Sequence, residues 1–295
     1  MAYVKAARSA QHFIGGGRSD MNRQPAESKE ASLTVPAAAA RSPSDLHAVI
    51  ERLGKRHFAH TPLSISDKGA VVAQFYRSRI TSAFQPLVRA RDGLVVGHQA
   101  LLRVEGGAGE SVALWSLFAQ ALDDAALVRL DRLCRTVHAL NYFPGARPGA
   151  SLFLNIESRL LTGVAADHGA YFETILALIG VPPARVVIVM PPDAIENPVA
   201  FVRAAISYRI RGYRVLVPVR SIADAELSHV FLADPHYVSI DAPDALEGAA
   251  ARRFLQALAQ RGTHLVARGI ENPEHEDLAR AAGVELLQGF HLGKP

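Results

Sequence analysis

The chain has 295 residues, 49% of them hydrophobic, which is enough for one large core or two modest ones. Its formal net charge of +4 arises in residues 1–60, which carry nine Lys and Arg against five Asp and Glu. Residues 61–295 carry twenty-three of each, so the basic excess predicts a solvated tail and argues against direct nucleic-acid binding. The single Cys134 excludes an intramolecular disulfide, and no apolar run reaches the length of a membrane span. We therefore expect a cytoplasmic protein with no membrane contact.

The N-terminal part lacks the pattern of a packed domain. Residues 1–41 are rich in Ala, Ser, Gly, Pro and Arg without a sustained period, and are expected to form a disordered leader. Met21 is an alternative start to Met1. Residues 42–66 are expected to hold a short amphipathic helix and a linker, because a helix-start pattern at Ser42–Asp45 precedes apolar residues at helical spacing. Docking of this helix on the main domain is favoured over docking on a partner.

From residue 67 to 295 short β-rich runs alternate with helical stretches, which predicts an α/β domain built from βα units. The expected helices lie near 170–180, 197–211, 224–232, 246–261 and 273–282. The number of runs favours a TIM-like (β/α)8 barrel over an open doubly wound sheet, because no Gly-rich phosphate loop opens a helix. The expected strands are Ile80–Val88, Leu94–Leu101, Ser151–Asn155, Val186–Met190, Arg214–Val217, Tyr237–Ile240, His264–Ala267 and Leu286–Gln288.

Barrel enzymes carry their chemistry at the carboxyl ends of the strands. Those positions here hold Gln99 and Arg103, Asn155, Val189, Pro218 and Val219, Ser239 and Asp241, Arg268 and Glu271, and Gln288. Such a set predicts a poor metal site, since only two members are carboxylates and hard metals prefer ionised oxygen ligands. No lysine lies between Lys68 and Lys294, so a mechanism that needs a lysine in this domain is excluded.

Several segments resemble the EAL-domain family, whose members hydrolyse cyclic di-GMP. The resemblance covers residues 67–295 and includes the opening strand, the signature segment with Gln99, and the closing segment with Gln288. The segments are Phe84–Val88, Gly97–Arg103, Leu152–Ile156, Val186–Pro192, Val215–Ser221, Ser239–Asp241, Val266–Glu271 and Leu287–Phe290.

The resemblance implies that most of the catalytic site is lost. Asn155 and Gln288 match positions that the family uses for metal binding or catalysis. Glutamates or aspartates of the family are replaced by Gln99, Val189, Pro218, Val219 and Arg268, and its lysine is replaced by Ser239. We therefore expect a degenerate EAL protein of the barrel type that is not an enzyme and uses no metal or other cofactor.

Two functions remain open. The first is an inactive regulatory module that acts through a protein partner in motility, biofilm or virulence control. The second is a metal-independent, non-hydrolysing receptor for cyclic di-GMP. A homodimer is compatible with either function. Pairing of Arg268 with Asp241 or Glu271 is favoured over a ligand role for that arginine. The candidate nucleotide-binding residues are Gln85, Arg103, Asn155, Arg220, Asp241, Arg268, Glu271 and Gln288.

Overall fold

The computed structural model describes residues 43–58, 62–107, 109–163, 168–222, 228–241, 246 and 248–295. The expected leader of residues 1–41, with both candidate start methionines, lies outside these ranges. None of the helices in the described ranges is long and apolar enough to cross a membrane.

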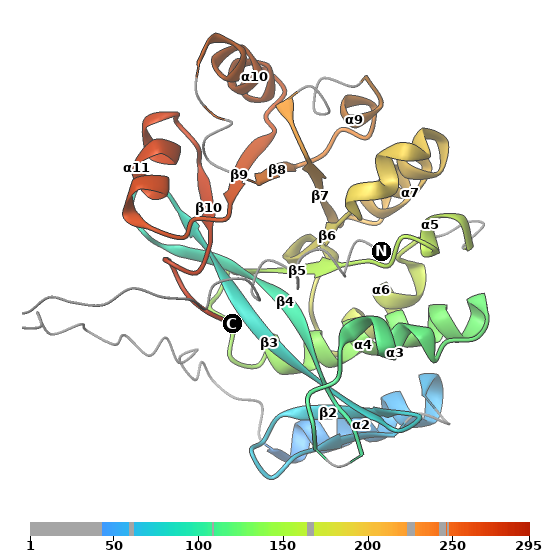
Figure 1. The fold of residues 1–295 in the computed structure, drawn as a ribbon. Helices are drawn as coiled ribbons and strands as arrows, with labels where there is room; N and C mark the ends of the chain where they lie inside the picture. The colour runs from blue at the N-terminus through green and yellow to red at the C-terminus, as the bar shows by residue number, and fades with distance from the viewer. Residues whose placement is uncertain are drawn as a thin grey trace, which may run out of the picture.

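The centre of the molecule is a closed barrel of the strands β3 to β10, which confirms the predicted α/β fold (Figure 1). Hydrogen-bonded neighbours follow the order β3-β10-β9-β8-β7-β6-β5-β4, and pairing of β3 with β4 closes the ring. The strands are β3 (Ser78–Arg89), β4 (Val95–Glu105), β5 (Ser151–Asn155), β6 (Val186–Val189), β7 (Arg214–Val219), β8 (Tyr237–Asp241), β9 (His264–Arg268) and β10 (Leu286–Gln288).

One strand departs from the parallel arrangement. β3 runs antiparallel to both of its neighbours, β4 and β10, whereas the other pairs in the ring are parallel. The reason is the short connection between β3 and β4, since only antiparallel strands can be joined by a tight turn. Gly93 supplies the left-handed conformation in this turn, with φ of 69°.

Helices cover the outside of the barrel (Figure 1), and the five helices expected from the sequence lie near their expected ranges. Side chains alternate along each strand, so one set fills the interior and the other packs under the helices. Leu87, Phe153, Val187 and Leu216 belong to the inner cluster. The helices are α3 (Leu114–Ala119), α4 (Asp124–Tyr142), α5 (Leu160–Gly163), α6 (Ala170–Leu178), α7 (Pro198–Ile210), α9 (Ser228–Leu232), α10 (Gly248–Gln260) and α11 (Pro273–Ala281), with short 3₁₀ turns at Pro183–Arg185 and Pro192–Glu196.

The N-terminal helix α2 (Pro43–His57) packs in cis on a small extension of the sheet. Leu53 and Val49 are buried in the outer core, and the Tyr171 hydroxyl donates a hydrogen bond to the carbonyl of His57 at 3.2 Å. The extension consists of β1 (Leu63–Ile65) and β2 (Val71–Phe75), and β2 pairs with β3. The sequence-based boundary at residue 67 therefore separates two strands that the structure pairs with each other.

Candidate site at the mouth of the barrel

Seven of the candidate positions face the interior at the carboxyl end of the barrel or the matching end of β3. Gln85 of β3 lies opposite Gln99 of β4 in the antiparallel register, and Asn155 ends β5 beside Val189 of β6. Pro218, Ser239 and Gln288 complete this set, since each is an even number of residues from an interior side chain on its strand. Residues far apart in the sequence thus meet at one mouth.

Four neutral amide side chains are joined into a hydrogen-bonded chain across this mouth. The Gln99 Nε2 group donates to Asn155 Oδ1 at 2.9 Å. Gln288 Nε2 donates to Gln99 Oε1 at 2.8 Å and to Gln85 Oε1 at 3.3 Å. The chain thus links β3, β10, β4 and β5. Because these amides satisfy one another, the mouth is held together here without any charged group.

The opposite side of the mouth is apolar and neutral. Val189 and Pro218 are buried, and Ser239 is only 1% exposed. The Ser239 Oγ atom has no hydrogen-bond partner among the described residues. Val219 does not contribute to this surface as expected: it belongs to the core under the helices, because a one-residue step along β7 turns the side chain to the other face.

The arginines near the mouth do not converge on one point. Arg268 makes two hydrogen bonds to Asp241, from Nε at 2.7 Å and from Nη2 at 2.9 Å, so the predicted pairing is observed. These residues lie opposite each other in the register of β8 and β9. Arg220 lies 3.6 Å from the exposed carboxylate of Glu196. Arg268 and Arg220 are thus each next to an acidic side chain.

Arg103 and Glu271 complete the predicted set. Arg103 is on the same side of β4 as Gln99, in the part of the β3–β4 ribbon that extends past the pairing with β5. Its guanidinium is exposed, and Nη1 donates only a 3.4 Å hydrogen bond to the carbonyl of Leu102. Glu271 is exposed beyond the end of β9, and the neighbouring His275 ring is held by the Gly269 carbonyl at 3.1 Å.

This set of donors does not fit a divalent metal ion. Among the described residues, no group of three or more His, Cys, Asp or Glu side chains could hold one. The side-chain oxygens of Gln85, Gln99 and Asn155 already accept hydrogen bonds from neighbouring amides, and the Asp241 carboxylate is bound by Arg268. Magnesium and manganese ions prefer several ionised oxygen ligands, which this mouth does not offer.

Comparison with known families agrees with the fold. A family model described as the EAL domain matches residues 70–295, which is most of the chain. The chain belongs to the EAL domain family. No curated protein sequence matches it.

Solved structures of EAL proteins share the barrel at low sequence identity. The Bacillus subtilis YkuI protein, solved with cyclic di-GMP and calcium, has a TM-score of 0.60 at 22% identity over 73% of this chain. The chain spans 55% of that protein's length. Klebsiella pneumoniae BlrP1, solved with manganese and cyclic di-GMP, has a TM-score of 0.58 at 19% identity. The match covers 72% of this chain and 54% of the BlrP1 chain. A standalone EAL protein from Vibrio cholerae O395 has a TM-score of 0.56 at 18% identity. The match covers 72% of this chain and 90% of the Vibrio chain.

Gln288→Glu tests whether the amide chain is a hydrogen-bonded unit. Gln288 is 4% exposed, and a carboxylate there would face the oxygens of Gln99 and Gln85 that now accept its hydrogen bonds. We expect a loss of about 2 kcal/mol in the free energy of unfolding at pH 7. Burial raises the pKa of an introduced carboxyl, and the protonated form can donate, so the loss should shrink near pH 4. Urea unfolding of the wild type and the variant at pH 7 and near pH 4 measures this loss of stability. An equal loss at both pH values would contradict the description of the amide chain as a hydrogen-bonded unit.

Proposed function

We propose that this EAL domain is catalytically inactive and acts as a regulatory module through a protein partner. The amide chain carries the proposal: Gln99 stands where the family resemblance places a glutamate, and this neutral side chain is hydrogen-bonded to Asn155 and Gln288. The scaffold is kept around this altered mouth, as expected if the barrel serves as a rigid platform.

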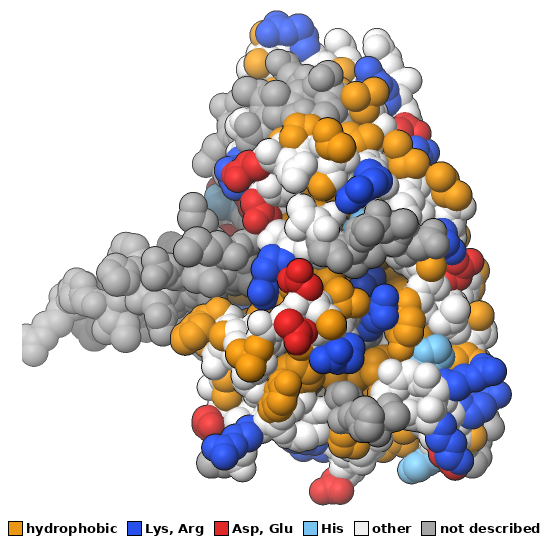
Figure 2. Space-filling model, turned by 90° about the vertical axis from the view of Figure 1, so that its right-hand side faces the viewer, with side chains coloured by type: hydrophobic (Ala, Val, Ile, Leu, Met, Phe, Trp, Pro, Cys, Tyr) orange, Lys and Arg blue, Asp and Glu red, His pale blue; other side chains and the backbone are white. Residues whose placement is uncertain are grey.

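An exposed apolar face on α7 supports the protein-partner role. Val199, Ile206 and Ile210 are 78%, 41% and 81% exposed, and their spacing places them on one side of the helix. The opposite side of α7, with Phe201 and Tyr208, is buried on the domain. Figure 2 views the molecule from the side on which α7 lies and shows hydrophobic side chains exposed among Lys and Arg side chains. Apolar surface of this kind is typical of sites that another protein covers.

The exposed Arg103 favours a second candidate, a metal-independent receptor for cyclic di-GMP. Arg103 makes no ion pair with a described residue, and arginine forks suit phosphate oxygens. Arg268 would have to leave Asp241 to contribute. Three further predicted contacts, Gln85, Asn155 and Gln288, are engaged in the amide chain. A nucleotide would therefore have to break existing hydrogen bonds, which ranks this candidate second.

Replacing Arg103 and Arg268 together by alanine separates the two functions. Calorimetric titration with cyclic di-GMP, with and without Mn²⁺, is made on the wild-type protein and on this double variant. The matched control is Arg252→Ala with Arg253→Ala, which removes the same charge from the exposed side of α10. We expect the wild-type protein not to bind cyclic di-GMP at micromolar concentration. We also expect the cellular phenotype and the co-purifying protein to persist in the double variant. Micromolar binding that the double variant loses together with the phenotype would establish the receptor instead.

Gln99→Glu alone is expected to produce no hydrolysis of cyclic di-GMP. One carboxylate cannot form a two-metal site while Val189, Pro218 and Ser239 provide no charged ligand beside it. The measurement is product formation in the presence of Mn²⁺ or Mg²⁺, with Gln99→Leu as the matched variant that cannot bind metal. Turnover in the glutamate variant and not in the leucine variant would show that other groups complete the site.

A further inference from the structure

An open groove lies on the surface between α6 and α7, away from the mouth of the barrel. It has a volume of about 400 Å³. Two exposed isoleucines of α7 form its walls together with charged and polar side chains. The lining residues are Glu173, Arg203, Ile206, Ser207, Ile210 and Arg211. None of the candidate residues of the mouth is among them, so the groove is a separate surface.

An exposed stripe of α7 runs beside this groove. Its members are Val199, Arg203, Ile206 and Ile210. At 3.6 residues per turn they fall within an arc of about 60° and span about 16 Å of the helix. The three apolar members have the spacing with which one helix packs on another. A stripe of this length and spacing therefore fits a partner helix of about three turns better than a small molecule.

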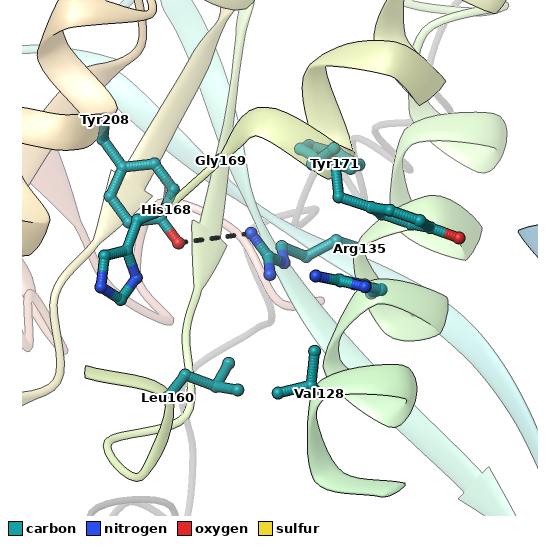
Figure 3. A pocket seen from close by; sticks show the side chains of 9 residues that line it. Val128, Arg135, Leu160, His168, Gly169, Tyr171 and Tyr208 are labelled. Carbon is teal, nitrogen blue, oxygen red and sulfur yellow. Dashed lines mark hydrogen bonds between the residues drawn. The ribbon is translucent and has the colours of Figure 1, made fainter. Parts of the chain in front are cut away.

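The buried side of α7 fixes the direction in which the stripe points. Phe201 and Tyr208 are buried on the domain. Arg135 of α4 donates a hydrogen bond of 3.5 Å from Nη1 to the Tyr208 hydroxyl, drawn in Figure 3. The helix begins with a cap, since the Asn197 side chain accepts a hydrogen bond from the Ala200 amide at 3.2 Å. A partner would therefore meet a preformed surface, which lowers the entropic cost of binding.

The arginines of α7 make this surface basic. Residues 199–211 include three arginines and no Asp or Glu. Two of the arginines are paired with acidic side chains of neighbouring segments. The third, Arg203, makes no ion pair with a described residue, and its Nη2 atom donates a long hydrogen bond of 3.5 Å to the carbonyl of Leu161. A carboxylate on a partner would complement Arg203 through charge-assisted hydrogen bonds.

Two other occupants fit these charges less well. In a symmetric pair of chains the stripe would face its own copy, so that Arg203 would approach a second Arg203. An anionic membrane attracts clusters of several basic side chains, whereas the groove also contains the carboxylate of Glu173. A helix with an acidic residue beside its apolar side complements both the stripe and Arg203.

We propose that the groove between α6 and α7 binds an amphipathic helix of a partner protein, with an acidic residue beside the apolar side of that helix. Apolar side chains of the partner pack on Val199, Ile206 and Ile210, and its carboxylate accepts hydrogen bonds from Arg203. This is the mode in which an amphipathic helix lies in an apolar groove and is held by a few anchoring side chains. The inference rests on the proposed function, since it names the surface and the class of partner through which the module acts.

A synthetic amphipathic peptide tests the proposal on the full chain. The probe has about 18 residues, long enough to form a helix, with leucines spaced by three and four residues and glutamates beside them. Fluorescence anisotropy compares it with a peptide that has lysine in place of glutamate and with a scrambled peptide of the same composition. We expect saturable one-to-one binding of the acidic probe, and binding of both controls weaker by about tenfold or more. Absence of saturable binding, or equal binding of either control, would overturn the proposal.

Substitutions on α7 locate the binding. Ile206→Asp and Ile210→Asp are each expected to weaken binding of the acidic probe by about tenfold or more. Ile210 is 81% exposed, so its replacement tests the site even if Ile206→Asp fails to fold. Leu122→Asp is the matched control, because it changes an 89% exposed residue outside α7, and its affinity should equal that of the wild type. Arg203→Glu should reverse the preference, so that the lysine peptide binds more tightly. Wild-type affinity in Ile210→Asp, or an unchanged preference in Arg203→Glu, would refute the location.

Three further measurements separate this inference from its alternatives and from the proposed function. Binding of phosphatidylcholine–phosphatidylglycerol vesicles that is lost in Ile210→Asp would overturn the proposal in favour of a membrane. A wild-type dimer that Ile210→Asp dissociates would overturn it in favour of a second copy. A co-purifying protein that stays bound to Ile210→Asp would refute the α7 site and leave the proposed function standing. Hydrolysis of cyclic di-GMP would contradict the proposed function and leave the peptide affinities as evidence for the groove.

Discussion

Asp131→Asn is expected to lower the free energy of unfolding by about 3–5 kcal/mol. The substitution keeps the size of the side chain and removes its charge, so the buried Arg135 cation is left without a counter-ion. Loss of one member of a buried pair costs far more than the pair contributes, because the remaining charge stays out of water. Urea unfolding of the wild type and the variant at pH 7 measures the difference.

The control for this prediction is an exposed pair with the same spacing. Glu51 and Lys55 form an ion pair across one turn of α2 with both side chains in solvent. Glu51→Gln should leave the free energy of unfolding nearly unchanged. The double variant Asp131→Leu with Arg135→Met should recover most of the stability lost in Asp131→Asn, since apolar side chains can replace a buried pair. Equal, small losses in Asp131→Asn and Glu51→Gln would contradict the buried-pair description.

Gly289→Ala is expected to cost about 3 kcal/mol or more, at the upper end of overpacking substitutions. A Cβ atom at Gly289 would lie 2.0 Å from the carbonyl oxygen of Ile270 and 2.3 Å from its nitrogen. Both atoms are backbone, so the segments that follow β10 and β9 would have to separate. The same segments are joined by the hydrogen bond from the Ile270 amide to the Gln288 carbonyl at 3.1 Å. Loss of this contact would also disturb the amide chain through Gln288.

Gly54→Ala provides the comparison for Gly289. Gly54 lies within α2, and a Cβ atom there would meet nothing within 4 Å. Because alanine favours a helix over glycine, this variant should be more stable by about 0.5–1 kcal/mol. Thermal unfolding of both variants measures the contrast. A stability change at Gly289 as small as that at Gly54 would show that the two segments are not in close contact.

Much of the barrel could be predicted from the sequence, because its strands are short apolar runs separated by helical stretches. The βα alternation from Ser151 to Gln288 gave strand positions that match the structure within a few residues. The antiparallel direction of β3 was not predicted, although the Asp92–Gly93 turn is a hairpin signal. β1 was missed because three residues carry little periodic pattern, and its pairing with β2 depends on tertiary contact.

The mouth was predicted in composition and only partly in geometry. The prediction that Gln99, Asn155 and Gln288 lie close together is confirmed, because the carboxyl ends of parallel strands meet at one end of the barrel. Their mutual hydrogen bonds depend on side-chain rotamers, which a sequence pattern does not specify. Val219 was misplaced by one step of strand alternation.

The buried ion pair of α4 was missed for a different reason. Its signal is a set of charged residues, Asp131, Arg132 and Arg135, inside the apolar helical run of α4. Charges at such positions usually lie on a solvated helix face. Only the packing of α6 and α7 on α4 shows that Arg135 is buried.

The most direct test of the account is an assay of cyclic di-GMP hydrolysis by the highly purified wild-type chain with Mn²⁺ or Mg²⁺. The described mouth offers amides, Val189, Pro218, Ser239 and an arginine already bound to Asp241, whereas metal-assisted hydrolysis normally uses several converging carboxylates. We expect the rate with either metal to equal the rate without protein. Metal-dependent turnover that persists through purification and is lost in Asn155→Ala would contradict it.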